Sequence, residues 1–278
     1  MLMNTLNLKA GKFPTDVLHS RTVADLVFAE TSYRSGQVIE NHSHKQAGFI
    51  IILQGEFLEI HEGRNRACKS SDVIFRPADQ LHADHFENTP TRCFNLQFGS
   101  DWLSKLERIT DGLILDDPTY FSGGVLFQLG LKLYSEFRMP DVDSPLIMEG
   151  LALEMIGAAN RLLIQKERSG APPWLKKVRE QLHAHFAEQL SIQLLAMEAG
   201  VHPIYLHRAF RKHYSQSIGE YLRTLRIQFC CAQLASTNVP LADISAVAGF
   251  YDQGHFSRIF KRMCGMTPLA YRKFFRTV

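Results

Sequence analysis

Residues Ser191 to Leu222 read SIQLLAMEAGVHPIYLHRAFRKHYSQSIGEYL, and residues Leu241 to Arg272 read LADISAVAGFYDQGHFSRIFKRMCGMTPLAYR. The two stretches align when one is shifted by about 50 positions, and such self-similarity indicates an internal repeat. The matched positions keep their apolar, glycine or basic character. They pair Leu206 with Phe256, Arg208 with Arg258, Phe210 with Phe260, Lys212 with Arg262, Tyr221 with Tyr271, and Gly200 with Gly249. The same small motif is therefore expected twice, and it decides the fold of the C-terminal part.

Each copy has the pattern of a short helix, a tight turn and a second helix. Gly200 and Gly249 stand where the first helix of each copy ends, a place that favours glycine because it adopts positive φ without a steric clash. The second helix of each copy is apolar on one face and basic on the other. We therefore expect helix-turn-helix motifs at about 191–213 and 241–263, in which the second helix enters the DNA major groove. The alternative is an ordinary helical bundle with a solvated basic face.

The second copy carries the most specific resemblance to a known family. GFYDQGHFSRIFKRMCGMTPLAYR, Gly249 to Arg272, resembles the C-terminal signature of the AraC/XylS family of bacterial transcription regulators. Gly254 departs from the pattern, because the family often has a polar side chain there. The resemblance implies a sequence-specific DNA-binding regulator that acts at promoters with RNA polymerase, as activator or repressor. It also implies a cytoplasmic protein that is not an enzyme.

Two kinds of DNA contact follow from the alignment with the family and from the order of residues along each helix. Positions that would face base edges are Ile204, His207 and Arg208 in the first motif, and Gln253, Gly254 and Arg258 in the second. Positions suited to phosphates are Lys212, Lys261 and Arg262, later on the helices. Arginine can bond guanine and glutamine can bond adenine, each in a bidentate manner.

One long helix is expected between the motifs. Ser217 and Glu220 form the S-x-x-E pattern of a capping box, and the helix would run to about Ala235. A rigid link of this kind would let one monomer place both recognition helices in successive major-groove segments, about 34 Å apart. A DNA binder without sequence preference is an alternative, against which the distinct side chains of the two helices speak.

Length and charge fit two domains with different partners. The chain has 278 residues and a net charge of +3, and this length allows two domains. Residues 171–278 hold 14 Lys and Arg against 6 Asp and Glu, whereas the preceding residues hold 17 against 22. A basic domain joined to an acidic one is typical of a polyanion-binding module with a separate sensor. Apolar runs of 18 or more residues and a secretory signal are not seen, so no membrane partner is expected. The five cysteines are odd in number and show no C-x-x-C spacing, which is expected of reduced thiols in a cytosolic protein.

Residues from about Val23 to Phe98 have the alternating runs and turn residues of an all-β domain, a sandwich or small barrel. Two histidine clusters lie in it, Gly36-x5-His42-x-His44 and Pro77-x4-His82. This pattern resembles the cupin barrel, whose motifs supply three histidines and a glutamate. His42, His44 and His82 match the histidine positions, whereas the glutamate position falls at Gly48.

Three interpretations of these histidines are possible. Three imidazoles at His42, His44 and His82 could hold a divalent metal, with water completing the shell. They could instead line the pocket of an organic effector together with Arg76, with no cofactor required, as the family resemblance favours. They could also have no physiological ligand. A metal-dependent cupin oxygenase or isomerase with a DNA module is the enzyme alternative, and the missing glutamate counts against it.

A helical pattern follows the β region, from about Thr119 to Lys166. Its two runs start at Leu126 and Pro145, and the second has an apolar stripe. The stripe comprises Leu146, Met148, Leu151, Met155, Ala159, Leu162 and Leu163. Such a pair packs on a barrel and, by the family resemblance, also supports a homodimer. A linker is expected at Glu167 to Lys177, where Gly and Pro break helices.

The predicted fold class is multidomain α and β. It combines an N-terminal cupin-like β-barrel that carries packed helices with a C-terminal all-α domain, in which one long helix joins two helix-turn-helix motifs. The expected division is a β sensor domain at 1–105, a helical dimerisation pair at 106–168 and a DNA-binding domain at 169–278. The expected function is a DNA-binding transcription regulator controlled by a small-molecule effector in the barrel.

Overall fold

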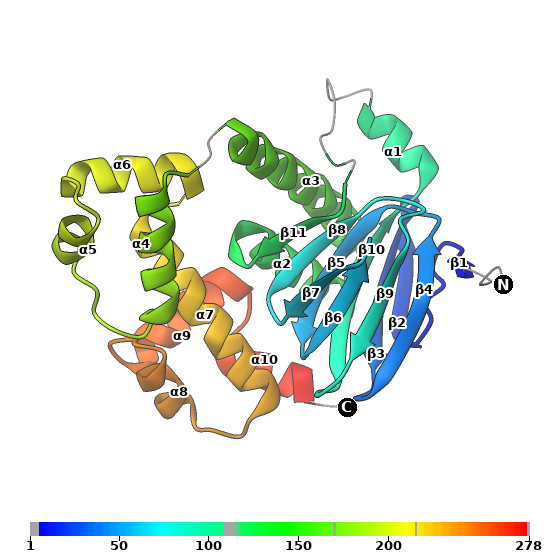
Figure 1. The fold of residues 1–278 in the computed structure, drawn as a ribbon. Helices are drawn as coiled ribbons and strands as arrows, with labels where there is room; N and C mark the ends of the chain where they lie inside the picture. The colour runs from blue at the N-terminus through cyan, green and yellow to red at the C-terminus, as the bar shows by residue number, and fades with distance from the viewer. Residues whose placement is uncertain (1–5, 108–114, 116, 169–170, 215, 277–278) are drawn as a thin grey trace. The chain divides into compact units, whose positions relative to one another are not determined.

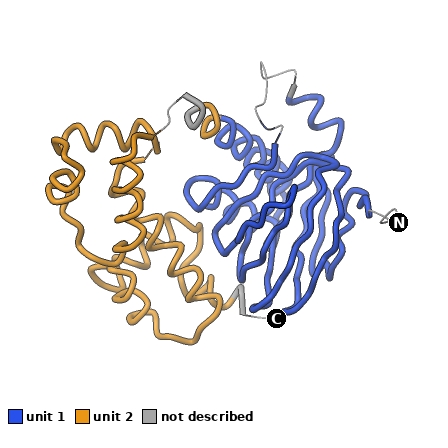
Figure 2. Tube along the Cα trace, in the orientation of Figure 1, with its two compact units in different colours: residues 1–160 blue, residues 161–278 orange. Residues whose placement is uncertain are grey.

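The computed structural model describes residues 6–107, 115, 117–168, 171–214 and 216–276. The chain divides into two compact units, an N-terminal unit of residues 1–160 and a C-terminal unit of residues 161–278 (Figure 2). The strands that the structure describes all lie in the N-terminal unit, and the C-terminal unit is helical (Figure 1). The predicted fold class, a β domain followed by a helical domain, is confirmed. The finer boundaries at 105 and 168 stay a prediction.

Two β-sheets form the N-terminal unit (Figure 1). One has the strand order β1-β4-β9-β6-β7 and the other has the order β11-β8-β5-β10-β3-β2. The strands are β1 (Leu6–Leu8), β2 (Asp16–Val23), β3 (Leu26–Tyr33), β4 (Gln37–His44), β5 (Gly48–Gln54), β6 (Glu56–His61), β7 (Arg64–Lys69), β8 (Asp72–Arg76), β9 (His82–Phe86), β10 (Thr91–Phe98) and β11 (Thr119–Ser122). Nearly all neighbours pair antiparallel, and only β1 and β4 among these described strands pair parallel.

The β region begins earlier than the sequence pattern predicts. The expected start, at about Val23, falls at the end of β2, because Ala24 and Asp25 have positive φ and form the turn between β2 and β3. Strand β2 lies at the edge of its sheet and is mostly exposed or half-buried, so it lacks the apolar alternation that marks a half-buried strand. The segment Thr119–Ser122, expected to be helical, pairs with β8 as strand β11.

The core of the N-terminal unit has two layers around strand β10, whose eight residues are all buried. On one side Tyr33 stacks on Phe86, with ring centroids 4.0 Å apart, next to Cys93. On the other side helix α2 (Gly124–Arg138) covers the sheet, and the rings of Tyr134 and Phe137 lie 5.1 Å from Phe94. Because both faces of β10 are covered, its residues do not alternate between buried and exposed positions.

Helix α2 is fixed to the sheet by a close backbone approach and by buried charges. A Cβ added at Gly130 would lie 2.8 Å from the side chain of Ile51, so glycine lets the helix lie this close. The Glu30 carboxylate on β3 accepts hydrogen bonds from the Tyr134 hydroxyl at 2.8 Å and from Arg138 at 2.9 Å. It also pairs with the buried Arg92 of β10.

Two further helices belong to this region. Helix α1 (Ser100–Glu107) follows β10 and was not predicted. Helix α3 (Ser144–Arg168) contains the second predicted run and buries Met148 and Met155. Leu146, placed by the sequence in the buried stripe, is 76% exposed. The fully buried positions of α3 recur at 148, 152, 155 and 159, and Leu146 lies off that face.

The C-terminal unit contains the predicted pair of motifs. Helices α5 and α6 form the first motif, α8 and α9 form the second, and α7 joins them (Figure 1). The helices are α4 (Pro173–Ala184), α5 (Ile192–Glu198), α6 (Pro203–Tyr214), α7 (Ile218–Ser236), α8 (Leu241–Val247), α9 (Gln253–Cys264) and α10 (Pro268–Arg276). Gly200 and Gly249 have φ of 66° and 77° after the first helix of each motif. Ser217 and Glu220 form the predicted capping box of α7.

The predicted linker is shorter than expected. Helix α3 continues to Arg168 and α4 begins at Pro173, so most of the segment 167–177 is helical. Pro173 lies in the first turn of α4, where its missing N–H costs no helical hydrogen bond. Ser169 and Gly170 lie outside the described residues. None of the helices that the structure describes is long and apolar enough to cross a membrane.

Candidate DNA interface and pocket

Helix α6 separates an apolar face from an exposed polar face. Leu206 and Phe210 are fully buried and pack with residues of α4 and α5. The positions predicted to contact DNA are exposed: Ile204, His207, Arg208 and Lys212. The 3.6-residue period puts these side chains on the surface because the apolar positions are fixed in the core.

Helix α9 repeats this arrangement in the second motif. Phe256 and Phe260 are fully buried, and the Asp252 side chain accepts a hydrogen bond from the His255 amide as the N-cap of the helix. The predicted contact positions are again exposed: Gln253, Gly254, Arg258, Lys261 and Arg262. At Gly254 an added Cβ would meet only the Asp252 carboxylate, at 3.3 Å, so the helix surface is open there.

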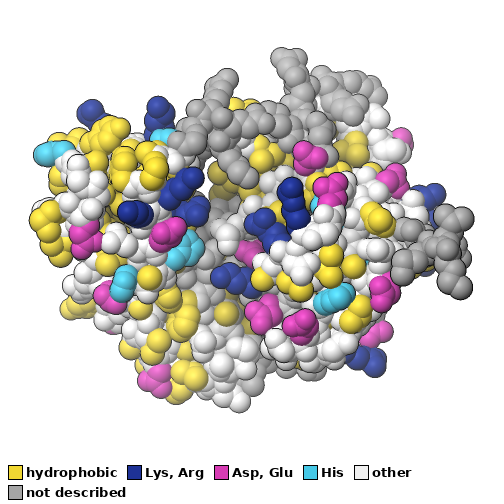
Figure 3. All heavy atoms as spheres, in the orientation of Figure 1, with side chains coloured by type: hydrophobic (Ala, Val, Ile, Leu, Met, Phe, Trp, Pro, Cys, Tyr) yellow, Lys and Arg dark blue, Asp and Glu magenta, His cyan; other side chains and the backbone are white. Residues whose placement is uncertain are grey.

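Two further exposed residues of these motifs were missed. Arg211 is exposed on α6 and, at the repeat spacing, corresponds to Lys261, which was predicted to contact phosphate. The sequence signal was available, because shifting Lys261 back by the 50-residue repeat leads to Arg211. Tyr251, two residues before the start of α9, is 90% exposed. Figure 3 shows Lys and Arg side chains together with hydrophobic ones on the surface over the α4–α6 part of the C-terminal unit.

The long helix α7 carries a guanidinium that connects the two halves of the C-terminal unit. Arg226 donates to the carbonyl oxygen of Phe186 at 2.8 Å and to that of Glu188 at 2.9 Å, in the segment between α4 and α5. It also donates to the Gly249 carbonyl at 2.6 Å, in the turn of the second motif. The planar fork of arginine suits several fixed acceptors at once. Arg226 therefore connects α7 to the segment before the first motif and to the turn of the second motif.

The predicted histidines come together between the two sheets of the N-terminal unit. His42 and His44 are two positions apart on β4 and point to the same side of the strand, as expected. In the antiparallel pair of β4 and β9, His42 lies opposite His82. One ring nitrogen from each of the three side chains lies within 4.8 Å of the others. His42 and His82 are 2% and 1% exposed.

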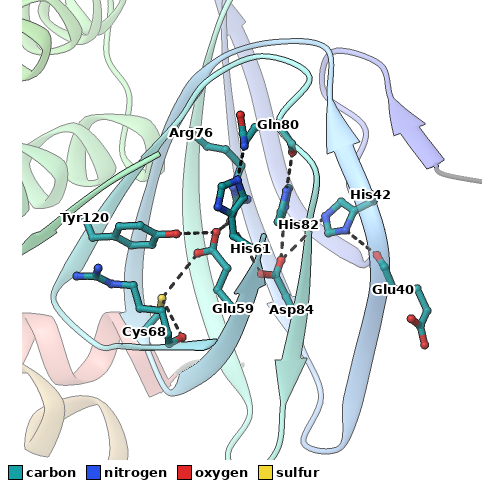
Figure 4. A network of polar contacts seen from close by, with 11 residues as sticks. Glu40, His42, Glu59, His61, Cys68, Arg76, Gln80, His82, Asp84 and Tyr120 are labelled. Carbon is teal, nitrogen blue, oxygen red and sulfur yellow. Dashed lines mark hydrogen bonds and ion pairs between the residues drawn. The ribbon is translucent and has the colours of Figure 1, made fainter. Parts of the chain in front are cut away.

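The hydrogen bonds of these histidines fix their orientation. The Nδ1 atoms of His42 and His82 each lie 2.9 Å from a backbone oxygen, that of Glu40 and that of Gln80 (Figure 4). Nδ1 therefore donates, and Nε2 of both rings is left with its lone pair toward the interior. Burial lowers the pKa of His42 to about 4 and that of His44 to about 3, and it also lowers the pKa of His82. The three rings are neutral at pH 7.

A buried group of charged side chains borders the histidines. Arg76 of β8 pairs with the Glu59 carboxylate of β6 at 3.0 Å, and the Tyr120 hydroxyl donates to Glu59 at 3.1 Å. Asp84 of β9 has its Oδ2 atom 4.0 Å from His42 Nε2 and 3.8 Å from His82 Nε2. Figure 4 shows His42, His82 and Asp84 directed toward one another. Burial raises the pKa of Asp84 to about 7.

A pocket that is partly open to solvent lies beside this cluster. Its polar lining includes the predicted pocket residues His42, His44 and Arg76, whereas His82 adjoins it through His42. Apolar side chains complete the wall: Phe13, Tyr33, Phe49, Ile50, Phe57, Phe86 and Leu96. A mostly apolar cavity with a few convergent polar groups is typical of a small-molecule site.

Asp84 and Glu59 are two buried acids beside the histidines that sequence reasoning missed. Asp84 follows His82 by two positions on one strand, so the alternation rule used for His42 and His44 would have placed it on the same face. His85, by contrast, is only half-buried. Glu59 has no comparable local signal, because its partner Arg76 lies on a strand of the other sheet.

Known proteins resemble this chain over the segment that contains both motifs. The Helix-turn-helix domain family matches residues 195–273. Over 93 residues the chain is 36% identical to the regulatory protein SoxS of Salmonella typhimurium, and the match covers 34% of this chain and 87% of SoxS. The chain belongs to the AraC/XylS family. It is a DNA-binding transcription regulator.

A longer relative of this AraC/XylS regulator spans both units. The Arabinose operon regulatory protein of Escherichia coli is 24% identical over 241 residues, a match that covers 81% of this chain and 80% of that protein. Among solved structures, ToxT from Vibrio cholerae O395 is 11% identical with a TM-score of 0.38, covering 91% of this chain and 99% of that one.

Proposed function

We propose that this regulator binds promoter DNA with α6 and α9 in successive major-groove segments, and that a small molecule in the N-terminal cavity sets its affinity for that DNA. The observation that carries the DNA half is the repeated exposed basic helix, which is present once on each side of α7. Arg226 of α7 bonds to the backbone before the first motif and in the turn of the second. Successive major-groove segments on one face of DNA lie about 34 Å apart.

The exposed side chains divide into two roles in this proposal. Arg208, Arg258 and Gln253 would contact base edges and supply sequence preference. Lys212, Lys261 and Arg262 lie in the C-terminal half of their helices and would neutralise phosphates. Engaging both helices would bend the DNA, at a cost of a few kcal/mol.

The cavity of the N-terminal unit supports the effector half. It joins apolar walls to the neutral imidazoles of His42 and His44, which can donate or accept hydrogen bonds, and to the charged Arg76. We propose binding rather than catalysis, because control of transcription requires only that the ligand favour one of two states of the protein.

The remaining partners follow from this role. A regulator of promoters would act with RNA polymerase in the cytoplasm. We also propose a homodimer formed through α3, because Leu146, Ile147 and Leu153 on this helix are 76%, 41% and 41% exposed. Apolar side chains of this kind bury well against a second copy.

The effector proposal can be tested by thermal unfolding with a library of small metabolites, followed by DNA affinity with each compound that stabilises the chain. Ile50→Trp fills the cavity wall, and Val38→Trp places the same ring on the exposed side of β4, where Val38 is 49% exposed. A compound that changes DNA affinity in the wild type and the Val38 variant but not in the Ile50 variant supports the proposal. Equal responses in both variants contradict it.

A further inference from the structure

We propose that His42, His44, His82 and Asp84 bind one divalent transition-metal ion, with Asp84 as the carboxylate ligand. This inference deepens the proposed effector site, on which it rests, because the ion would lie at the polar end of the same cavity. The sequence pattern offered three histidines and no carboxylate, since Gly48 occupies the position where a glutamate was expected. In the structure a carboxylate near the histidines is that of Asp84, on strand β9.

The donor atoms are oriented for an ion. His42 and His82 use Nδ1 to donate to backbone oxygens, so both present Nε2 to the interior. Metal-binding histidines have the same arrangement, because the bond to the outer nitrogen fixes the ring. Among the side chains that the structure describes, His82 Nε2 and His44 Nδ1 are buried atoms without a hydrogen-bond partner. Such atoms are costly unless something binds them.

Asp84 completes this set. Its side chain is 9% exposed, and Oδ2 lies within 4.0 Å of the Nε2 atoms of both His42 and His82. Arg76 is 3.9 Å from the other oxygen of Asp84 but only 3.0 Å from Glu59. Because Glu59 already neutralises Arg76, Asp84 in its ionised form adds a negative charge to the buried cluster, and a divalent ion would balance that charge.

The donor chemistry selects the class of ion. Three imidazole nitrogens and one carboxylate oxygen suit Zn²⁺, Fe²⁺, Co²⁺ or Ni²⁺, whereas Mg²⁺ and Ca²⁺ prefer all-oxygen sites. The cavity beside the cluster would let a small molecule reach the ion and bind with it.

The test uses the full chain, stripped of metal with a chelator and titrated with Co²⁺, whose visible absorption reports its ligands. Bound Co²⁺ per chain is measured after gel filtration. We expect one Co²⁺ per wild-type chain. Asp84→Asn keeps the size of the side chain but removes its charge, and it should weaken Co²⁺ binding at least tenfold. Losing a residue that only supports a metal ligand already costs about 10- to 100-fold in metal affinity, so losing a ligand should cost no less. The visible spectrum should change as well.

Asp79→Asn is the matched control, because Asp79 is an exposed carboxylate three residues before His82 that accepts a hydrogen bond from Asn7. It should bind Co²⁺ as the wild type does. His44→Gln provides a second variant, at the more exposed histidine, should Asp84→Asn fail to fold as judged by circular dichroism. Wild-type protein that retains no Co²⁺ overturns the inference. An unchanged affinity and spectrum in folded Asp84→Asn overturns the role of Asp84.

The proposed DNA function has a separate readout. If stripped wild-type chain binds no Co²⁺ but still selects specific duplexes, the metal inference fails and the regulator proposal stands. If Co²⁺ binds as expected but no duplex is selected with or without it, the regulator proposal fails and the metal site stands.

Discussion

Arg226 on the long helix α7 donates a hydrogen bond to the carbonyl oxygen of Gly249, at 2.6 Å, in the turn of the second motif. Gly249 itself has a φ of 77°, and a Cβ added there would lie 2.0 Å from the carbonyl oxygen of Ala187. The turn of the second motif is therefore packed against the segment between α4 and α5, which Arg226 holds as well. These contacts make the two motifs parts of one body.

Removing this connection should loosen both motifs. A hydrogen bond from a charged donor contributes roughly 1.5–3 kcal/mol, but solvent screens the three bonds of the half-buried Arg226, so their contributions do not add in full. We therefore expect Arg226→Ala to lower the free energy of unfolding by about 2–4 kcal/mol. Urea unfolding measures this. Arg223→Ala, one turn earlier on α7, is the control. Equal losses in the two variants would refute the connecting role of Arg226.

The base-reading prediction concerns Arg208 and Arg258, the exposed arginines at matching repeat positions. Arg208→Ala or Arg258→Ala should cost about 1–3 kcal/mol of affinity at the specific site and relax sequence preference at one position. Competition binding with duplexes that vary each base measures both effects. Arg161→Ala, an exposed arginine outside both motifs, should change neither. Unchanged preference in both motif variants would defeat the assignment.

Lys261 should act through charge alone. It is exposed in the last turn of α9. Lys261→Ala should weaken binding to all duplexes alike and reduce the slope of log affinity against log salt by about 0.9. Binding titrations of specific and random duplexes over a salt series measure this. A loss confined to the specific duplex would instead make Lys261 a base-reading residue.

The buried charges around Glu30 should matter for stability rather than for DNA. Glu30→Gln leaves the buried Arg92 and the half-buried Arg138 without their carboxylate, and breaking such a group costs about 3–5 kcal/mol. Tyr134→Phe removes one hydroxyl from the same group and should cost about 1 kcal/mol.

The chain has two tryptophans, Trp102 in the N-terminal unit and Trp174 in the C-terminal unit. Fluorescence in a Trp174→Phe background therefore follows unfolding of the N-terminal unit. A Glu30→Gln variant as stable as Tyr134→Phe would show that the group contributes little.

Local patterns predicted the features that depend on neighbouring residues in the sequence. The apolar period placed Phe256 and Phe260 in the core and left Arg258 exposed, and the S-x-x-E pattern found the start of α7. Strand alternation placed His42 and His44 on one side of β4. These rules need no knowledge of distant contacts.

Features that depend on pairing across the fold could not be predicted in the same way. Asp84 approaches His42 only because β4 and β9 pair in one register, which contains an irregularity between Ile39 and His42. Arg226 binds backbone oxygens about 23 to 40 positions away, and such acceptors leave no trace in side-chain type. Strand β2, polar and at a sheet edge, gave no apolar signal.

Selection of duplexes from a random pool by the purified chain tests the central claim most directly. Two motifs fixed to one helix should enrich two short sequence blocks whose centres lie about one helical turn apart, 10–10.5 base pairs. With the Arg226→Ala variant, the two blocks should still be enriched, but the spacing between them should vary. A single enriched block, or two blocks at variable spacing in the wild type, would contradict the claim that both helices read DNA as one body.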